Sequence, residues 1–172
     1  MKHLNELKWK AFDLCDIFSI SAGVRLTKSD MIEGTRPFIG ATDSNNGITA
    51  FVSDSNPSLD CNVLGVNYNG SVVENFYHPY ECIFSDDVKR LHLLNHEDNK
   101  YVLLFMKSAI LKQQVKYQYG YKFNGERMRK QKIMLPVDES GQPDYDYMEE
   151  YMKMVENRLL SNYRVYMKHK YG

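Results

Sequence analysis

The sequence predicts an α+β protein, in which a mixed β-sheet globule is followed by a long C-terminal helix with coiled-coil-like spacing. Three observations predict this fold class. Short β-rich runs separated by turn residues fill about the first 95 residues. The apolar spacing then changes to three- and four-residue steps, which is typical of a helix. A second segment with helical spacing fills the end of the chain, so we expect a globule at 1–140 and a helix within 141–172.

The composition is that of one globular domain with an appended element. The chain has 172 residues, of which 43% are apolar, and this is enough for a packed core. No run approaches the roughly 18 apolar residues that span a bilayer, and the N-terminus MKHLNELKWK is amphipathic and contains an acid, unlike a signal peptide. We therefore expect a cytoplasmic protein without a membrane partner. The cysteines, Cys15, Cys61 and Cys82, form no CxxC pair and are interpreted as buried, reduced thiols.

Several short strands are expected in the globule. Residues 4–21 read as an entry segment followed by a strand, with Trp9 as a core anchor. Pro37 begins a buried strand that ends in the turn residues 43–47, and residues 48–52 form the next strand. Residues 80–84 and 88–94 add two further strands, with a turn at Asp86-Asp87 between them.

The strongest local signal is a β-hairpin in VLGVNYNGSVVENFYH. Two β-rich runs meet there at Asn69-Gly70, a pair that readily supplies the two positive-φ residues of a type I′ turn. The sequence therefore predicts two antiparallel strands joined by a tight turn at this pair.

Apolar residues at helical spacing then predict an amphipathic helix from about Asn99 to Lys116. A short apolar strand, residues 133–137, follows and ends in the turn residues DESGQPD. Between the helix and this strand lies a stretch that contains two glycines and several aromatic residues.

The terminal helix is expected to begin at Asp144, which can cap it, and to extend for about 25 residues, roughly 37 Å. Acidic residues lie near its N-terminal end, and Lys168 and Lys170 near the other, as the helix dipole favours. Residues at alternating four- and three-residue steps form a coiled-coil seam: Met148, Met152, Val155, Leu159, Asn162 and Tyr166. Either this helix packs at the edge of its own sheet, or it pairs with another helix.

Positive charge is concentrated in the middle of the chain, although the net charge is zero. Between Lys100 and Lys132 there are nine Lys or Arg residues and one acid, Glu126. In the stretch 116–137 these bases alternate with Tyr and Phe, and this combination suits a polyanion with stackable bases, such as a nucleic acid. The alternative is a solvated basic surface with no ligand.

No catalytic motif stands in the chain: GxGxxG, P-loop, HExxH and GxSxG are all absent. Asp86-Asp87-Val88-Lys89 resembles a metal-dependent nuclease core only in its spacing. His92 and His96 would hold a metal only if they lay on a helix, and the residues around them read as strand and loop. His78 reads as a surface or structural group. We therefore expect no catalytic residues, no metal and no cofactor on this chain.

The order of the pieces resembles the specificity subunits of type I restriction-modification systems, and the related type IIB and IIG subunits, over one half-unit. The resemblance is carried by these segments: Trp9-Lys10, Phe12-Asp13-Leu14 and Ile17-Phe18; residues 23–28; Pro37-Phe38-Ile39 with Thr42 and residues 45–48; Asn69-Gly70-Ser71 before residues 76–79; Lys116-Tyr117-x-Tyr119-Gly120; Ile133-x-Leu135-Pro136-Val137; and Pro143-Asp144-Tyr145.

The resemblance implies a DNA target recognition domain at 1–140 and a spacer or dimerisation helix at 141–172. Such a subunit is non-catalytic, reads a half-site of a bipartite double-stranded DNA target, and holds methyltransferase subunits and, through them, a nuclease-translocase. S-adenosylmethionine, ATP and Mg²⁺ would belong to those partners. A full-length subunit of the family has two recognition domains and two helices. This chain has one of each, so it either pairs with itself through the helix or is half of a longer product.

On this reading the candidate contacts to phosphates or guanine edges are Arg25, Lys28, Lys122, Arg127, Arg129, Lys130 and Lys132. The candidates for base-edge or stacking contacts are Asn45, Asn46, Gln118, Tyr119, Tyr121 and Asn124. Two other functions compete with DNA reading. One is an interaction scaffold built on the long helix, and the other is a small metal-dependent nuclease that uses Asp86 and Asp87.

Overall fold

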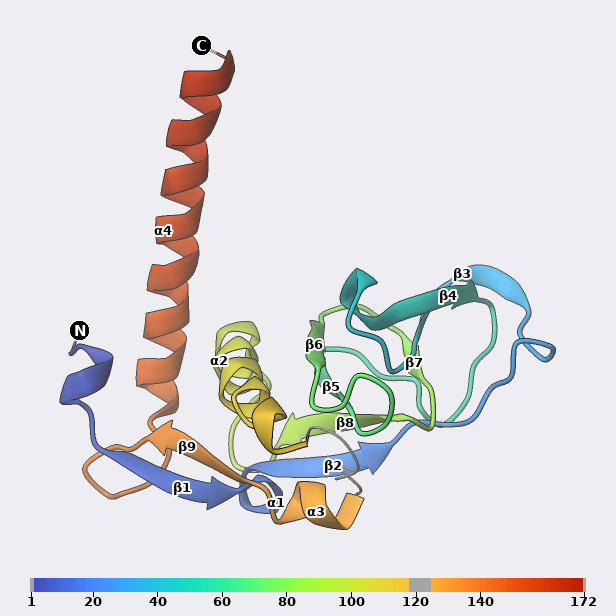
Figure 1. Cartoon of the computed structure of the whole chain (residues 1–172), viewed down its shortest axis with the longest axis horizontal. Coiled ribbons are helices and arrows are strands. Elements are labelled where there is room, and N and C mark those ends of the chain that lie inside the picture. The colour runs from blue at the N-terminus through green and yellow to red at the C-terminus, as the bar shows by residue number, and fades with distance from the viewer. Residues whose placement is uncertain (1, 118–124, 172) are drawn as a thin grey trace.

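The computed structural model describes residues 2–117 and 125–171. Figure 1 shows a globule of small β-sheets and short helices, from which one long helix, α4, projects. The strands of the described residues form three sheets, with the orders β1-β9, β2-β8-β5-β6 and β4-β3-β7. The predicted fold class is thus confirmed.

The N-terminal segment consists of two strands separated by one helical turn. A 3-10 turn, η1 (Leu4–Glu6), precedes β1 (Trp9–Asp13), α1 (Leu14–Ile17) and β2 (Phe18–Ala22). β1 pairs antiparallel with β9 (Lys132–Pro136), which closes a contact between the two ends of the globule. The prediction of a single strand here was wrong, because Leu14 and Ile17 turn into the core on α1.

The central sheet contains β5 (Val63–Asn67), β6 (Asn75–His78) and β8 (Val88–Leu93), and β2 pairs with its β8 edge. All pairings in it are antiparallel. Every residue of β5 is buried, since this strand lies inside the sheet and is covered on both faces. The predicted strand at 88–94 and the turn at Asp86-Asp87 are confirmed.

The third sheet forms the lobe at the upper right of Figure 1. It contains β3 (Glu33–Ile39), β4 (Ile48–Val52) and the short β7 (Ile83–Phe84), with β3 antiparallel to β4 and parallel to β7. β3 begins before Pro37, where the sequence placed its start, because the pairing with β4 continues past a register shift between Glu33 and Arg36. Of the strand predicted at 80–84, only the last two residues form β7.

The predicted hairpin is confirmed, but its tight turn is not. β5 and β6 pair antiparallel, with Val66 opposite Asn75, so the connection is much longer than two residues. Gly70 has a positive φ, whereas Asn69 does not, so the type I′ turn was wrong. Tertiary contacts override the local preference. The Asn69 side chain donates a hydrogen bond to Asp87, and a Cβ at Gly70 would lie 2.5 Å from the Ala41 carbonyl oxygen.

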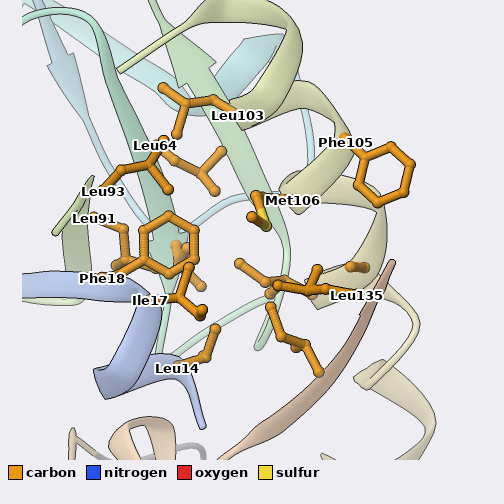
Figure 2. Close-up of a cluster of buried hydrophobic side chains, with 14 of the residues drawn as sticks. Leu14, Ile17, Phe18, Leu64, Leu91, Leu93, Leu103, Phe105, Met106 and Leu135 are labelled. Atoms are coloured by element: carbon orange, nitrogen blue, oxygen red, sulfur yellow. The ribbon is translucent and has the colours of Figure 1, made fainter. Parts of the chain in front are cut away.

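Helix α2 (Lys100–Leu111) covers the central sheet and forms the core with it. Asn99 caps it by accepting hydrogen bonds from two backbone N–H groups of the first turn. Figure 2 shows side chains from the sheet, from α1 and from α2 meeting in one cluster. Its members include Leu14, Leu64, Leu91, Leu103 and Met106, all fully buried. The helix ends earlier than predicted, and a separate 3-10 turn, η3 (Gln114–Tyr117), follows it.

Helix α4 (Tyr145–Tyr171) follows β9, and its first turns are fixed to the globule. Asp144 caps it, as predicted, by accepting a hydrogen bond from the Tyr147 N–H. The Tyr147 hydroxyl donates to the Lys2 carbonyl, and Glu156 accepts hydrogen bonds from Lys100 and Tyr101 of α2. From residue 157 onward most of the helix is exposed and rises away from the globule (Figure 1).

Two expectations about the core were wrong. Trp9 is not a core anchor: it is 36% exposed and stacks on Phe105 at the base of α4. Of the three cysteines only Cys82 is buried, and this burial raises the pKa of its thiol to about 12, whereas Cys61 is exposed. None of the helices in residues 2–117 and 125–171 combines the length and the apolar character that a membrane-spanning segment needs.

Candidate nucleic-acid interface

A cluster of basic residues, the basic group, lies on and just after α3 (Gly125–Arg129) and consists of Arg127, Arg129, Lys130 and Lys132. Met128 of this short helix is fully buried and fixes it to the core. The neighbouring residues Arg127, Arg129, Lys130 and Lys132 are all exposed. Because Met128 is buried, the basic residues on either side of it face outward and place positive charge on the surface of this segment.

Two acids partly offset the charge of this basic group. The Lys130 ammonium lies 3.6 Å from Glu126, one helical turn away, and the Lys132 ammonium lies 3.8 Å from Asp13. Both pairs are long, and the lysine side chains are 77% and 67% exposed, so they contribute little to stability. These lysines can therefore exchange their partners for a phosphate at little cost.

A polar pocket of about 390 Å³ adjoins the basic group. Its lining includes Arg127, Lys130 and Tyr117. The buried side chain of Gln131 orders this region, because its amide oxygen accepts from the Tyr117 hydroxyl and its amide nitrogen donates to Gln113. Sequence reasoning missed Gln131, whose role depends on partners contributed by η3 and the end of α2.

Five predicted contact residues lie outside the described residues. They are Gln118, Tyr119, Tyr121, Lys122 and Asn124, and their assignment stays a prediction.

Arg25 and Lys28 lie in the connection between β2 and β3, and both are exposed. The Arg25 guanidinium is 3.7 Å from Asp86, and its side chain is 77% exposed. The start of the connection is fixed tightly, because Val24 N–H donates to the Phe84 carbonyl and a Cβ at Gly23 would lie 2.0 Å from the Ser85 carbonyl oxygen. Arg25 and Lys28 therefore follow directly after a segment of backbone that is held in place.

Asn45 and Asn46 lie in the turn η2 (Asn45–Gly47), between β3 and β4. Both side chains are exposed. All three residues of this turn have positive φ, at 49°, 55° and 79°. The predicted turn at residues 43–47 is confirmed, and asparagine and glycine are the residues that tolerate its left-handed backbone.

The predicted DNA-contact residues do not form one patch. In Figure 1, α3 lies at the lower edge of the globule and the β3–β4 lobe at the upper right, with β2 and β8 between them. The basic group on α3 is therefore separate from the turn that carries Asn45 and Asn46. A DNA duplex would have to contact one of these surfaces or extend past both.

The residues of the nuclease hypothesis are engaged in other contacts. Asp86 faces Arg25, and Asp87 accepts a hydrogen bond from Asn69 at 2.6 Å. The Lys89 ammonium lies 4.2 Å from the ring centroid of Tyr68, and burial lowers the pKa of Lys89. The described part of the chain contains no group of three or more His, Cys, Asp or Glu side chains that could hold a metal ion.

His92 belongs to a charged cluster that sequence reasoning missed. Its Nδ1 is 2.6 Å from Asp98 and its Nε2 is 3.0 Å from Asp60, which also binds Arg90 at 2.9 Å. The hydrogen bond to Asp98 and the charge of Asp60 raise the pKa of His92 to about 9. His96 lies against Tyr145 instead, so the two histidines do not converge. Asp60 and His92 are 32 residues apart, too far for any local signal.

The predicted helix-pairing residues divide into two groups. Met148 is fully buried in the core of the globule, and Met152 and Val155 are partly buried. Leu159 and Tyr166 are 60% and 53% exposed, and Asn162 is also exposed. The outer residues of the seam thus belong to none of the hydrophobic clusters of the described residues.

An apolar pocket of about 530 Å³ lies at the foot of α4. Its lining includes Trp9, Phe105, Met134 and Met152. Met152 belongs to the predicted seam, so the pocket and the exposed apolar side of α4 are adjacent.

Comparisons with known proteins agree with this architecture. A family model described as the type I restriction modification DNA specificity domain matches residues 6–162. The specificity subunit S.BcgI of a type II restriction enzyme, from Heyndrickxia coagulans, is 62% identical over 160 residues, 93% of this chain and 47% of that protein. The chain therefore spans about half the length of this curated relative.

Two solved structures share the fold at low sequence identity. The S subunit of a type I restriction-modification system from M. genitalium has a TM-score of 0.64 and 17% identity, over 96% of this chain and 43% of that one. The HsdS subunit from Thermoanaerobacter tengcongensis has a TM-score of 0.63 and 13% identity, over 91% of this chain and 39% of that one. The fold and the family match together establish that this chain belongs to the family of type I restriction-modification DNA specificity domains.

Proposed function

We propose that this chain reads one half-site of a bipartite double-stranded DNA target and docks DNA methyltransferase subunits. The family consists of specificity subunits, which are non-catalytic, so the prediction that the chain is not an enzyme is confirmed. The observation that carries DNA reading is the set of exposed bases on α3, held outward by the buried Met128. Bases displayed on a fixed element supply the phosphate contacts that position a protein on DNA.

We also infer that α4 pairs with a second helix, in a second copy of this chain or in the other half of a longer one. Exposed Leu159 and Tyr166 support this pairing, since they extend beyond any surface that the described globule offers. The opposite charges at the two ends, with Asp146 in the first turn and Lys168 and Lys170 in the last, favour an antiparallel pair. Two identical chains would then form a two-fold dimer and read a palindromic bipartite target.

The chemistry of the proposed assembly belongs to other subunits. S-adenosylmethionine would be bound by the methyltransferase subunits, and ATP and Mg²⁺ by a nuclease-translocase that this chain contacts only through them. We propose no cofactor site on this chain.

A charge-reversal experiment tests DNA reading. The variant Arg127→Glu, Arg129→Glu and Lys130→Glu should lose most of its affinity for a pool of random-sequence duplexes, and the affinity of the wild type should fall steeply as salt is added. A gel shift across a salt series, with the methyltransferase subunit present, measures both. The matched control reverses the exposed Lys2 and Lys8 of the N-terminal segment, which belong neither to the proposed interface nor to the helix-pairing residues, and should leave DNA affinity largely unchanged.

Affinity that does not depend on salt, or that survives the triple reversal on α3, would contradict this interface. A chain that assembles with the methyltransferase but gives no DNA binding would favour the interaction scaffold. Cleavage of duplex DNA by the chain alone with Mg²⁺ would revive the nuclease hypothesis, and we expect none.

A further inference from the structure

The turn that presents Asn46 has an unusual backbone. Asn45, Asn46 and Gly47 have consecutive φ values of 49°, 55° and 79°. A left-handed conformation costs roughly 1–2 kcal/mol for most residues, and asparagine is among the few besides glycine that adopt it readily, so the identity of these residues is tied to the shape of the turn. The turn is also pressed against the core, because a Cβ at Gly47 would lie 3.2 Å from Ile39 and 3.3 Å from Phe76.

The amide of Asn46 is held by a tyrosine from another part of the chain. Its Nδ2 donates a hydrogen bond of 3.0 Å to the hydroxyl of Tyr80, 34 residues away. Tyr80 lies after β6 and is partly buried against the cluster that contains Ile39 and Phe84. Among the described residues, the neighbouring Asn45 side chain has no such hydrogen bond. Asn46 is thus the exposed amide of this turn with a fixed orientation.

His78 fixes Tyr80 from behind. The His78 ring is fully buried and lies edge-on to Tyr80, with centroids 5.8 Å apart, and to Phe84, with centroids 5.3 Å apart. Its Nδ1 is 3.4 Å from the Tyr80 hydroxyl. Gly65 makes room for the ring, because a Cβ there would lie 3.0 Å from both His78 and Phe84.

The protonation of His78 completes a chain of polar contacts. Burial lowers the pKa of His78 to about 4, so the ring is neutral at pH 7, and in the tautomer that carries its proton on Nε2 its Nδ1 accepts from the Tyr80 hydroxyl. Tyr80 then accepts from Asn46 and donates to His78. The Tyr80 oxygen accepts one hydrogen bond and its hydrogen donates the other. The rotation of the hydroxyl is therefore defined, and the hydroxyl holds the Asn46 amide in place.

The atoms of Asn46 that remain free are its Oδ1 and its second N–H. Side by side, these are the acceptor and donor with which an asparagine binds the major-groove edge of adenine, accepting from N6 and donating to N7. We propose that Asn46 reads an adenine of the target in this way, and that Tyr80, supported by His78, is the positioning residue for its amide. This inference rests on the proposed function that the chain reads DNA.

The experiment first defines the sequence that the wild-type chain, with its methyltransferase subunit, selects from random duplexes. Each adenine of the selected half-site is then replaced by 7-deazaadenine, which lacks the N7 acceptor. One position should weaken wild-type binding by about 2- to 10-fold, because 7-deazaadenine removes one of the two hydrogen bonds of the bidentate contact. Asn46→Gly adopts the same φ without strain, and it should bind more weakly but show no further loss when that adenine is replaced.

Tyr80→Phe tests the positioning role separately. It should reduce the preference for adenine at the same position and leave the salt dependence of binding unchanged, since no phosphate contact is removed. Tyr77→Phe is the matched control: it removes a hydroxyl that donates to Asn62 at 2.7 Å, and it should keep the full preference. Thermal unfolding of each variant shows whether the fold is retained.

Several outcomes would overturn the inference. The inference fails if Asn46→Gly loses as much affinity as the wild type when each adenine is replaced. It also fails if Tyr80→Phe prefers adenine as strongly as the wild type does. A uniform loss across all sequences with a shallower salt dependence would show a phosphate contact instead. A wild-type chain that selects no sequence at all would refute the proposed function itself, and the inference with it, which distinguishes the two failures.

Discussion

The two halves of α4 have similar apolar spacing but different surroundings. In the first turns Tyr147 is 8% exposed and Met148 is fully buried in the core of the globule. Farther along, Leu160, Tyr163 and Val165 are 49%, 58% and 56% exposed. The comparison teaches that apolar spacing predicts which side of a helix will be covered, but not whether the same chain or another one covers it.

The difference also concerns the stability of the helix itself. Isolated helices shorter than about 12–15 residues are marginal in water, and most helical stability comes from packing. The anchored half packs on α2, and the ion pair between Glu149 and Lys153 at 2.5 Å adds a small local contribution. The projecting half lacks such packing in the described globule, which is why a helical partner would stabilise it most.

The largest expected effect is on self-association through the projecting half of α4. Leu159→Asp would bury an uncompensated charge twice in a two-fold helix pair, so self-association should weaken by roughly a thousand-fold or more. Light scattering over a range of concentrations would measure the mass. Asn157→Asp adds the same charge about 200° around the helix from Leu159 and should leave the mass unchanged. A wild-type chain that stays monomeric both alone and with the methyltransferase subunit would contradict pairing.

The next largest effect is on the stability that the anchored half of α4 gives to the fold. Met148→Ala leaves a cavity in the core and should lower the free energy of unfolding by about 2–5 kcal/mol. Met154→Ala, at a side chain that is 42% exposed on the same helix, should change it by about 0.5 kcal/mol or less. Urea denaturation of both variants gives the comparison. Equal losses would mean that the exposed side of the anchored half is packed as tightly as its buried side.

The smallest effect concerns the loop beneath the anchored half, where Asp98 accepts from both His92 and the Leu93 N–H. The folded pKa of His92 is about 9, above its ordinary value of 6.5, so its contribution to stability is complete below pH 6.5 and is lost as pH rises through 9. The urea midpoint of the wild type should fall across this window, and that of His92→Gln should fall less.

His78 provides the internal control for this pH series. Its folded pKa of about 4 lies below 6.5, so its contribution is present above pH 6.5 and is lost as pH falls through 4. Both the wild type and His92→Gln should show this acid-side loss. A variant that changes both sides of the profile would indicate a general loss of packing rather than the loss of one titrating group.

Local patterns predicted the elements better than their partners. The hairpin of β5 and β6, the helix after Asn99 and the cap at Asp144 follow from residues close together in the sequence. The pairing of β1 with β9, the exposure of Trp9 and the contact from Asn46 to Tyr80 depend on residues far apart, which no local preference specifies. The candidate site was predicted as residue types, whereas its division into two separate surfaces required the fold.

The attachment of α4 has a mechanical consequence. A 27-residue helix is about 40 Å long, so it acts as a lever arm, and a tilt of about 5° at its base would move its far end by roughly 3.5 Å. That displacement is close to the rise of one base-pair step, about 3.4 Å. The contacts of Tyr147 with Lys2 and of Glu156 with Lys100 and Tyr101 brace this base. In the proposed helix pair, angular stiffness at the root of the helix would then set how accurately the two recognition domains are spaced along DNA.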